Sequence, residues 1–290
     1  MENLQWLLII AAFGGGVIGA YIGALPAFIL TGFIAIAGGT AALAGAADLT
    51  VGYVAFGAYL GPHVAFAGGV AAAAYAHKTK KLDNGVDITA SLWGTGDPMT
   101  LIVGGIFGLV GMLIFQVLAA ISFPSDLPGT TVVILAVVTR FMFGTTGLTG
   151  KYEGEGNRVW FSGGKGFACN VLLGLGIGVA ISLIYAEMVR AGVDAAVLGS
   201  FPIVCFGIAA ASLIFTQTGF ACPATHHIAY PAACAAVWSG NPAMGIIFGI
   251  LGSLIGDFVI NTFNSHCDTH IDPPATTIMI LICAATLLFA

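Results

Sequence analysis

Long apolar stretches alternate with short polar ones along the whole chain. Since about 20 apolar residues cross a bilayer as a helix, residues 4–45 are expected to form two helices that break at Leu25-Pro26. Residues 51–76 are expected to form a third helix, interrupted at Gly61-Pro62. The remaining apolar stretches predict helices at 99–121, 128–148, 166–188, 195–217, 222–238, 242–262 and 274–290. The pattern predicts an all-α integral membrane protein with about ten transmembrane helices.

Three blocks of sequence recur in the same order in the two halves of the chain. The pairs are 63–72 with 227–236, 97–108 with 241–252, and 126–131 with 272–277. Preserved order indicates a duplicated unit. We therefore expect a first five-helix repeat, a linker loop and a second five-helix repeat, at residues 1–148, 149–165 and 166–290.

An odd number of helices in each repeat determines its orientation. The second copy must enter the membrane upside down, which gives two inverted repeats. Basic residues cluster in the loops after the third and fifth helices: Lys78, Lys80, Lys81, Lys151, Arg158 and Lys165. The positive-inside rule places these loops in the cytoplasm and both termini outside. The expected location is the plasma membrane of a prokaryote.

Composition supports the membrane assignment. Hydrophobic residues make up 58% of the chain and charged residues only 7%, more apolar surface than a soluble domain of this length can bury. The bilayer is thus an expected partner. The 42 glycines predict helices that pack at short backbone distances, and they are compatible with a homo-oligomer.

Two histidines occupy matching positions in the repeats. His63 and His227 are each followed three residues later by an aromatic residue, Phe66 or Tyr230, and each closely follows a proline. Ionisable side chains inside a membrane often line a polar path, and prolines free backbone carbonyls that can bind a solute. These four residues are candidates for a substrate pathway. The alternative is that the histidines bond to neighbouring helices for packing.

A second matched motif contains Asp126 and Thr130 in the first repeat and Asp272 and Thr276 in the second. Carboxylates and prolines at these positions are typical of helix N-termini, where they satisfy free backbone amides. The functional alternative is that both helix starts face a cavity and offer oxygen atoms to a cation.

Two charged residues fall inside predicted helices. Arg140 and Asp257 would each be costly in hydrocarbon, and pairing would relieve both. We therefore expect a contact between them across the repeat interface, and we include both in the substrate pathway. Glu187 and Arg190, three residues apart, are expected to form a local pair.

The second half also gathers side chains of the kind that bind zinc or similar metals. They are Cys222, His226, His266, Asp268 and His270. Their spacing matches no fixed zinc signature, and the segment 266–272 would also form an ordinary solvated loop.

Catalytic signatures are missing from the sequence. We find no phosphate-binding loop, dinucleotide fingerprint, zinc-protease motif or nucleophile elbow, so enzymatic activity is not expected, and no basic face supports nucleic-acid binding. The leading hypothesis is a transporter or channel for a small solute or ion, either a cation or a small polar molecule, with its site between the repeats.

Two alternatives to transport are considered. The glycine-rich segment 144–155 resembles a loop in the membrane subunits of the sodium-translocating methyltransferase of methanogens. That resemblance, about 30 residues including one helix, implies a non-catalytic membrane subunit of a larger ion-translocating complex. A sensor or scaffold would lack a water-accessible path to either histidine.

Overall fold

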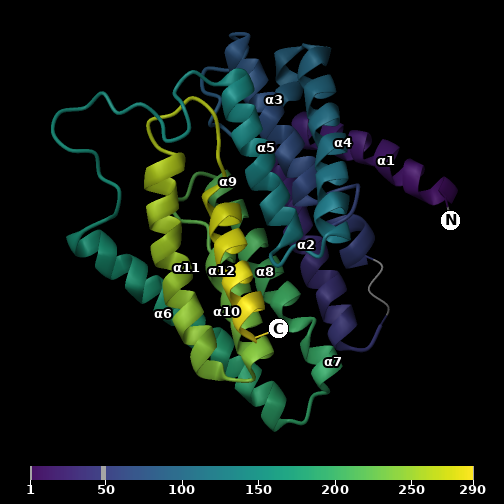
Figure 1. The fold of residues 1–290 in the computed structure, drawn as a ribbon, viewed down its shortest axis with the longest axis vertical. Coiled ribbons are helices and arrows are strands. Elements are labelled where there is room, and N and C mark those ends of the chain that lie inside the picture. The colour runs from purple at the N-terminus through teal and green to yellow at the C-terminus, as the bar shows by residue number, and fades with distance from the viewer. Residues whose placement is uncertain (1, 47–49, 290) are drawn as a thin grey trace.

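The computed structural model describes residues 2–46 and 50–289, without the side chains of residues 2–5. In these ranges the fold is entirely helical (Figure 1). The first half contains α1 (Glu2–Ile22), α2 (Ala24–Leu43), η1 (Val51–Ala55), η2 (Pro62–Phe66), α3 (Ala67–Lys78), η3 (Leu92–Thr95), α4 (Pro98–Ala120) and α5 (Leu127–Phe143). The second half contains α6 (Gly164–Arg190), α7 (Ala195–Leu198), α8 (Phe201–Ala211), α9 (Leu213–Gln217), α10 (His226–Ser239), α11 (Pro242–Phe263) and α12 (Pro273–Phe289).

The break between the first two helices lies at Gly23, two residues before the predicted Leu25-Pro26. Gly23 adopts a positive φ of 100°, which glycine tolerates because it has no Cβ atom. Pro26 then falls in the first turn of α2, where a missing N–H is harmless. Glycine therefore sets this break.

The third predicted helix is interrupted at Gly61-Pro62, as the sequence predicts. Two π-helical turns, η1 and η2, precede the regular helix α3. The carbonyl of Leu60, next to the break, accepts a hydrogen bond of 2.8 Å from the hydroxyl of Thr31. A side chain thus satisfies a carbonyl that the interrupted helix leaves free.

The stretch 195–217 was predicted as one helix, but it forms three short ones, α7, α8 and α9. Pro202 occupies the first turn of α8, where it lacks the N–H that would continue the preceding helix. The second junction lies at Ser212, whose hydroxyl donates to the carbonyl of Ala209.

The helices contact one another in a similar pattern in the two halves. In the first half α1 lies against α3 and α4, and in the second α6 lies against α10 and α11. The halves meet where α2 contacts α8 and α5 contacts α12. The central helices α8, α10 and α12 are flanked by α6 and α11 on one side and α2 and α5 on the other (Figure 1).

Glycines allow close contact within each half. A Cβ atom on Gly16 of α1 would lie 2.1 Å from the carbonyl oxygen of Gly104 in α4. A Cβ atom on Gly174 of α6 would lie 2.6 Å from the carbonyl oxygen of Gly249 in α11. The short backbone distances predicted from the glycine content are therefore present.

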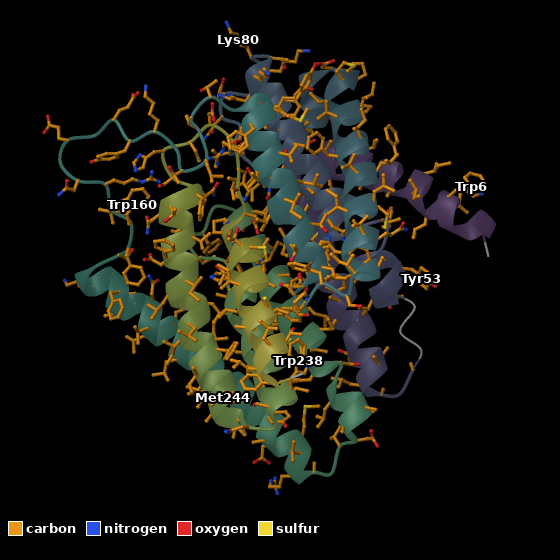
Figure 2. All side chains as sticks on the ribbon, viewed as in Figure 1. Trp6, Tyr53, Lys80, Trp160, Trp238 and Met244 are labelled. Carbon is orange, nitrogen blue, oxygen red and sulfur yellow. The ribbon has the colours of Figure 1, made fainter. Side chains whose placement is uncertain are left out.

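In the described ranges, five helical segments are long and apolar enough to cross a membrane by length and composition. They are α2, α4, α6, the combined segment Ala195–Gln217, and α11. Large apolar side chains face outward, such as Leu172 and Leu183 on α6 and Trp6 at the edge of the molecule (Figure 2). These features are compatible with a membrane location.

Three loops meet at one end of the bundle. The ammonium of Lys78 donates to the carbonyl of Met142 at 2.8 Å, which joins the ends of α3 and α5. The backbone N–H of Lys151 donates to the carbonyl of His266 at 2.7 Å. Lys80 marks this end in Figure 2, whereas Trp238 and Met244 lie toward the other end.

Candidate functional site

A cavity of about 680 Å³ lies where the two halves meet. Its wall includes residues from the first half, such as Phe28 of α2 and Asp126 at the start of α5, and from the second, such as Tyr230 of α10 and Asp272 at the start of α12. The wall is mostly apolar with a few polar groups, which is typical of binding sites for small molecules.

Two adjacent histidines at the start of α10 line this cavity. The His226 ring lies between Phe28 and Phe206, with ring centroids 4.8 Å and 5.8 Å away. His227 places Nε2 next to Gly256, 2.4 Å from where a Cβ atom would be. The side chains are 5% and 8% exposed, and among the described residues the Nδ1 atom of neither has a hydrogen-bond partner.

The aspartates of the repeated motif cap their helices, which confirms the capping prediction. Asp126 accepts a hydrogen bond from the N–H of Gly129 at 2.6 Å, and Asp272 accepts one from Ala275 at 2.7 Å. Both aspartates also line the cavity. His270, a further wall residue, lies with Nε2 3.1 Å from the second oxygen of Asp272. The two helix starts that share this cavity thus present carboxylates.

The other predicted members of this motif lie outside the cavity wall. Thr130 and Thr276 donate their hydroxyls to the carbonyls of Asp126 and Asp272, one turn earlier in the same helix, at 2.7 Å and 2.8 Å. Both threonines are buried. Their side chains stabilise the first turns of α5 and α12.

The two matched histidines have different surroundings. His63 is 0% exposed and does not line the cavity; its ring stacks on Phe115, which does, at 4.4 Å between centroids. Neither ring nitrogen of His63 has a hydrogen-bond partner among the described residues. Phe66 and Tyr230, the aromatic residues that follow the two histidines, both line the cavity.

The expected contact between Arg140 and Asp257 is wrong. Arg140 is 1% exposed, and its guanidinium donates to four carbonyls at 2.7–3.0 Å and to the Thr269 hydroxyl. The carbonyls belong to Gly147, Leu148, Phe263 and Thr269. Because α5 ends at Phe143 and not at the predicted residue 148, Arg140 lies in the last turn and reaches loop backbone.

Asp257 lies on the cavity wall, but its hydrogen-bond partner is Ser162 and not Arg140. Its carboxylate accepts hydrogen bonds from the N–H and the hydroxyl of Ser162, at 2.7 Å and 2.6 Å. The loop before α6 is thereby attached to α11. The local pair predicted between Glu187 and Arg190 is confirmed, with Nε donating at 2.8 Å.

The residues predicted as metal ligands are not brought together. Among the described residues, no group of three or more His, Cys, Asp or Glu side chains could hold a metal ion. His226 and His270 line the cavity, whereas Cys222 lies beside Thr216 and the His266 ring packs against Tyr152. The last of the five, Asp268, accepts hydrogen bonds from the loop after α5. Loop contacts separate these residues from the histidines of the cavity.

Sequence reasoning missed most of the aromatic wall. Phe28, Phe56 and Phe206 line the cavity, yet nothing distinguishes them from other phenylalanines in apolar helices. Phe115 of α4 was missed for the same reason.

The fold and the cavity define an all-helical protein with several apolar helices and, between its two halves, a mostly apolar cavity that contains a few polar side chains. The chain belongs to a family of unknown function (DUF7973), which matches residues 1–157 and 177–290. No curated protein and no solved structure matches the chain.

Proposed function

We propose that this protein is a membrane-embedded transporter or channel for a small solute or ion, and that the central cavity is its solute site. The observation that carries this proposal is the cavity itself, which is built from both halves and contains histidine and aspartate side chains. Ionisable groups are costly within a membrane and are mostly retained where they act on a solute.

The proposed architecture is two inverted five-helix repeats, with all ten apolar segments of the sequence crossing or entering the membrane. The contact pattern is similar in the two halves, since α1 contacts α3 and α4 and α6 contacts α10 and α11, and this similarity supports the proposal. The carbonyl of His63 lies against Gly111 of α4, and in the same way that of His227 lies against Gly252 of α11. Transporters built from inverted repeats have their sites at the repeat interface, often beside broken helices.

The proposed orientation puts the basic loops in the cytoplasm and both termini outside. The loops after α3 and α5 meet at one end of the bundle, joined by the hydrogen bond from Lys78 to Met142. A membrane protein retains positively charged loops on its cytoplasmic side, and we propose the plasma membrane of a prokaryote as the location.

Uptake into proteoliposomes tests the proposal. The purified chain alone would be assayed with divalent metals, sodium, protons and small neutral solutes, as wild type and as His226→Gln plus His227→Gln. A matched control is His266→Asn, since His266 is exposed, lies outside the cavity and has a positive φ that asparagine tolerates. We expect flux of at least one solute, a decrease of about tenfold or more in the double variant, and no change in the control.

Absence of flux for every solute, from protein that remains folded, would contradict autonomous transport. If the protein also co-purified from its native membrane with other subunits, the non-catalytic subunit of a larger complex would replace the transporter as the proposed function. Equal flux in the wild type and the double variant would show that the solute pathway does not pass the two histidines of the cavity.

A further inference from the structure

The cavity wall is rich in aromatic rings that contact one another across the two halves. Phe206 of α8 packs against Phe28 of α2 at 5.6 Å between ring centroids, against Phe56 at 5.3 Å and against Tyr230 of α10 at 5.9 Å. Phe28 also packs against Phe66 at 5.6 Å. Such a wall accommodates an apolar body, and ring faces attract cations through their quadrupoles.

The charges on the wall all have one sign. Asp126, Asp257 and Asp272 line the cavity, and no lysine or arginine does so within the described part of the chain. The positive ends of α5 and α12 are already occupied by the capping carboxylates of Asp126 and Asp272. An anion would therefore meet carboxylates and no free positive group, whereas a cation is favoured.

A bare metal ion does not fit this lining. Both carboxylate oxygens of Asp257 accept hydrogen bonds from Ser162. In Asp272, one oxygen accepts from the N–H of Ala275 and the other lies within hydrogen-bond distance of His270. The apolar surface offers few replacements for a hydration shell. The volume of about 680 Å³ instead falls in the range of about 300–1,000 Å³ that holds organic ligands.

Two buried nitrogen atoms lie just behind the cavity wall. Nδ1 of His226 and Nδ1 of His227 lack hydrogen-bond partners among the described residues, although both side chains are more than nine-tenths buried on the cavity wall. A buried polar atom left unpaired costs about 1–3 kcal/mol. Both atoms are out of contact with the cavity interior as the rings are placed, so the rings must turn before an ammonium group, which carries N–H donors as well as charge, can donate to them.

We propose that the cavity binds a protonated amine with an apolar body, with the ammonium at Asp126, which uses only one carboxylate oxygen to cap its helix, and the body against the aromatic rings. This inference rests on the proposed function, for which it names the class of solute. It accounts together for the aromatic wall, the carboxylates and the size of the cavity.

Calorimetric titration of the full chain in detergent at about pH 7 tests the inference with three ligands of similar size. They are phenethylammonium, the neutral 2-phenylethanol and the anion phenylacetate. We expect the ammonium ion to bind at least about tenfold more tightly than the alcohol, and phenylacetate to bind most weakly. No binding of phenethylammonium, equal binding of the alcohol, or preference for phenylacetate would overturn the inference, whatever the variants do.

Variants locate the site. Asp126→Asn retains a side chain that caps α5. It should lower the affinity for phenethylammonium by about tenfold and leave the affinity for 2-phenylethanol unchanged. Asp83→Asn removes an exposed carboxylate away from the cavity and should change nothing. Phe206→Leu keeps an apolar side chain but removes the ring face, and it should also lower the affinity for phenethylammonium. If the folded variants bind it as wild type does, the assigned site is wrong.

The outcome is separable from that of the proposed function. Ammonium binding without flux of any solute into proteoliposomes would contradict the transporter and retain the amine site. Flux of another solute without ammonium binding would retain the transporter and overturn the amine.

Discussion

His63 and His227 occupy matched positions in the two halves of the molecule, but their surroundings differ. His63 is fully buried beneath the ring of Phe115, whereas His227 lines the cavity beside Gly256. The backbone contact is the same in both, since each histidine carbonyl lies against a glycine of the neighbouring long helix, Gly111 or Gly252. The neighbour of the ring differs, since Phe115 covers His63 and Gly256 leaves room beside His227.

Removing the Phe115 ring should erase this difference and should have the largest effect on stability. We expect Phe115→Ala to lower the free energy of unfolding by about 3 kcal/mol, the lower end for phenylalanine truncation, because Phe115 is half-buried. It should also open His63 to the cavity. Thermal unfolding in detergent and reaction of His63 with diethyl pyrocarbonate, mapped by mass spectrometry, measure the two effects.

The control for that variant is Phe258→Ala on α11, whose side chain is 46% exposed on the outer surface. It should unfold close to the wild-type temperature. If His63 stayed unreactive in a folded Phe115→Ala protein, Phe115 would not be what separates it from the cavity.

The shared backbone contact can be broken in either half. A Cβ atom at position 111 would lie 1.8 Å from the His63 carbonyl oxygen, and one at position 252 would lie 2.7 Å from that of His227. Since backbone must shift, we expect Gly111→Ala and Gly252→Ala each to cost about 1–3 kcal/mol, with the larger cost at Gly111.

Gly176→Ala is the matched control for these glycine variants. Gly176 lies in α6 with nothing within 4 Å of an added Cβ atom, so alanine should stabilise this helix by up to about 1 kcal/mol. Unfolding temperatures of the three variants, measured side by side, test the order. Equal stability of Gly111→Ala and Gly176→Ala would refute the contact.

Exchanging each histidine for phenylalanine sharpens the comparison further. The His63 ring has no hydrogen bond to lose among the described residues and stacks on another ring, so His63→Phe should change stability by less than about 1.5 kcal/mol and leave phenethylammonium binding unchanged. His227→Phe should impair that binding, because it replaces a polar ring of the cavity wall with an apolar one. Titration of both variants decides; loss of binding only in His63→Phe would reverse the assignment.

The smallest effect concerns Asp268, which joins the halves at their loops. Its carboxylate accepts hydrogen bonds from the N–H and hydroxyl of Thr145, both at 2.7 Å, and from Thr146 at 2.8 Å. Burial acts to raise the pKa of Asp268, but these hydrogen bonds outweigh it and hold the pKa below its ordinary value. Such a carboxylate stabilises the fold above its unfolded pKa of about 3.9, and this stabilisation is lost as pH falls through the folded value.

Thermal unfolding between about pH 3 and pH 6 tests this linkage. The unfolding temperature of the wild type should fall more steeply below about pH 4 than that of Asp268→Asn. Asp83→Asn, which removes an exposed carboxylate, should follow the wild type. Parallel curves for Asp268→Asn and the wild type would exclude the contribution.

Much of the fold was predictable because apolar length and helix-breaking residues act locally. The helix starts at Asp126 and Asp272 and the break at Pro62 follow from the sequence. The site was less predictable, because it depends on rotation about helix axes and on loop paths. Arg140 illustrates this: an end of α5 five residues earlier than predicted directs its guanidinium to loop carbonyls and away from Asp257.

The contacts between glycines have a consequence for motion. Where Gly16 meets Gly104 and Gly174 meets Gly249, backbone touches backbone, and no flexible side chain lies between the helices to absorb a displacement. We expect α1 with α4, and α6 with α11, to move as rigid bodies. Relative motion of the two halves would then occur where α2 meets α8 and α5 meets α12.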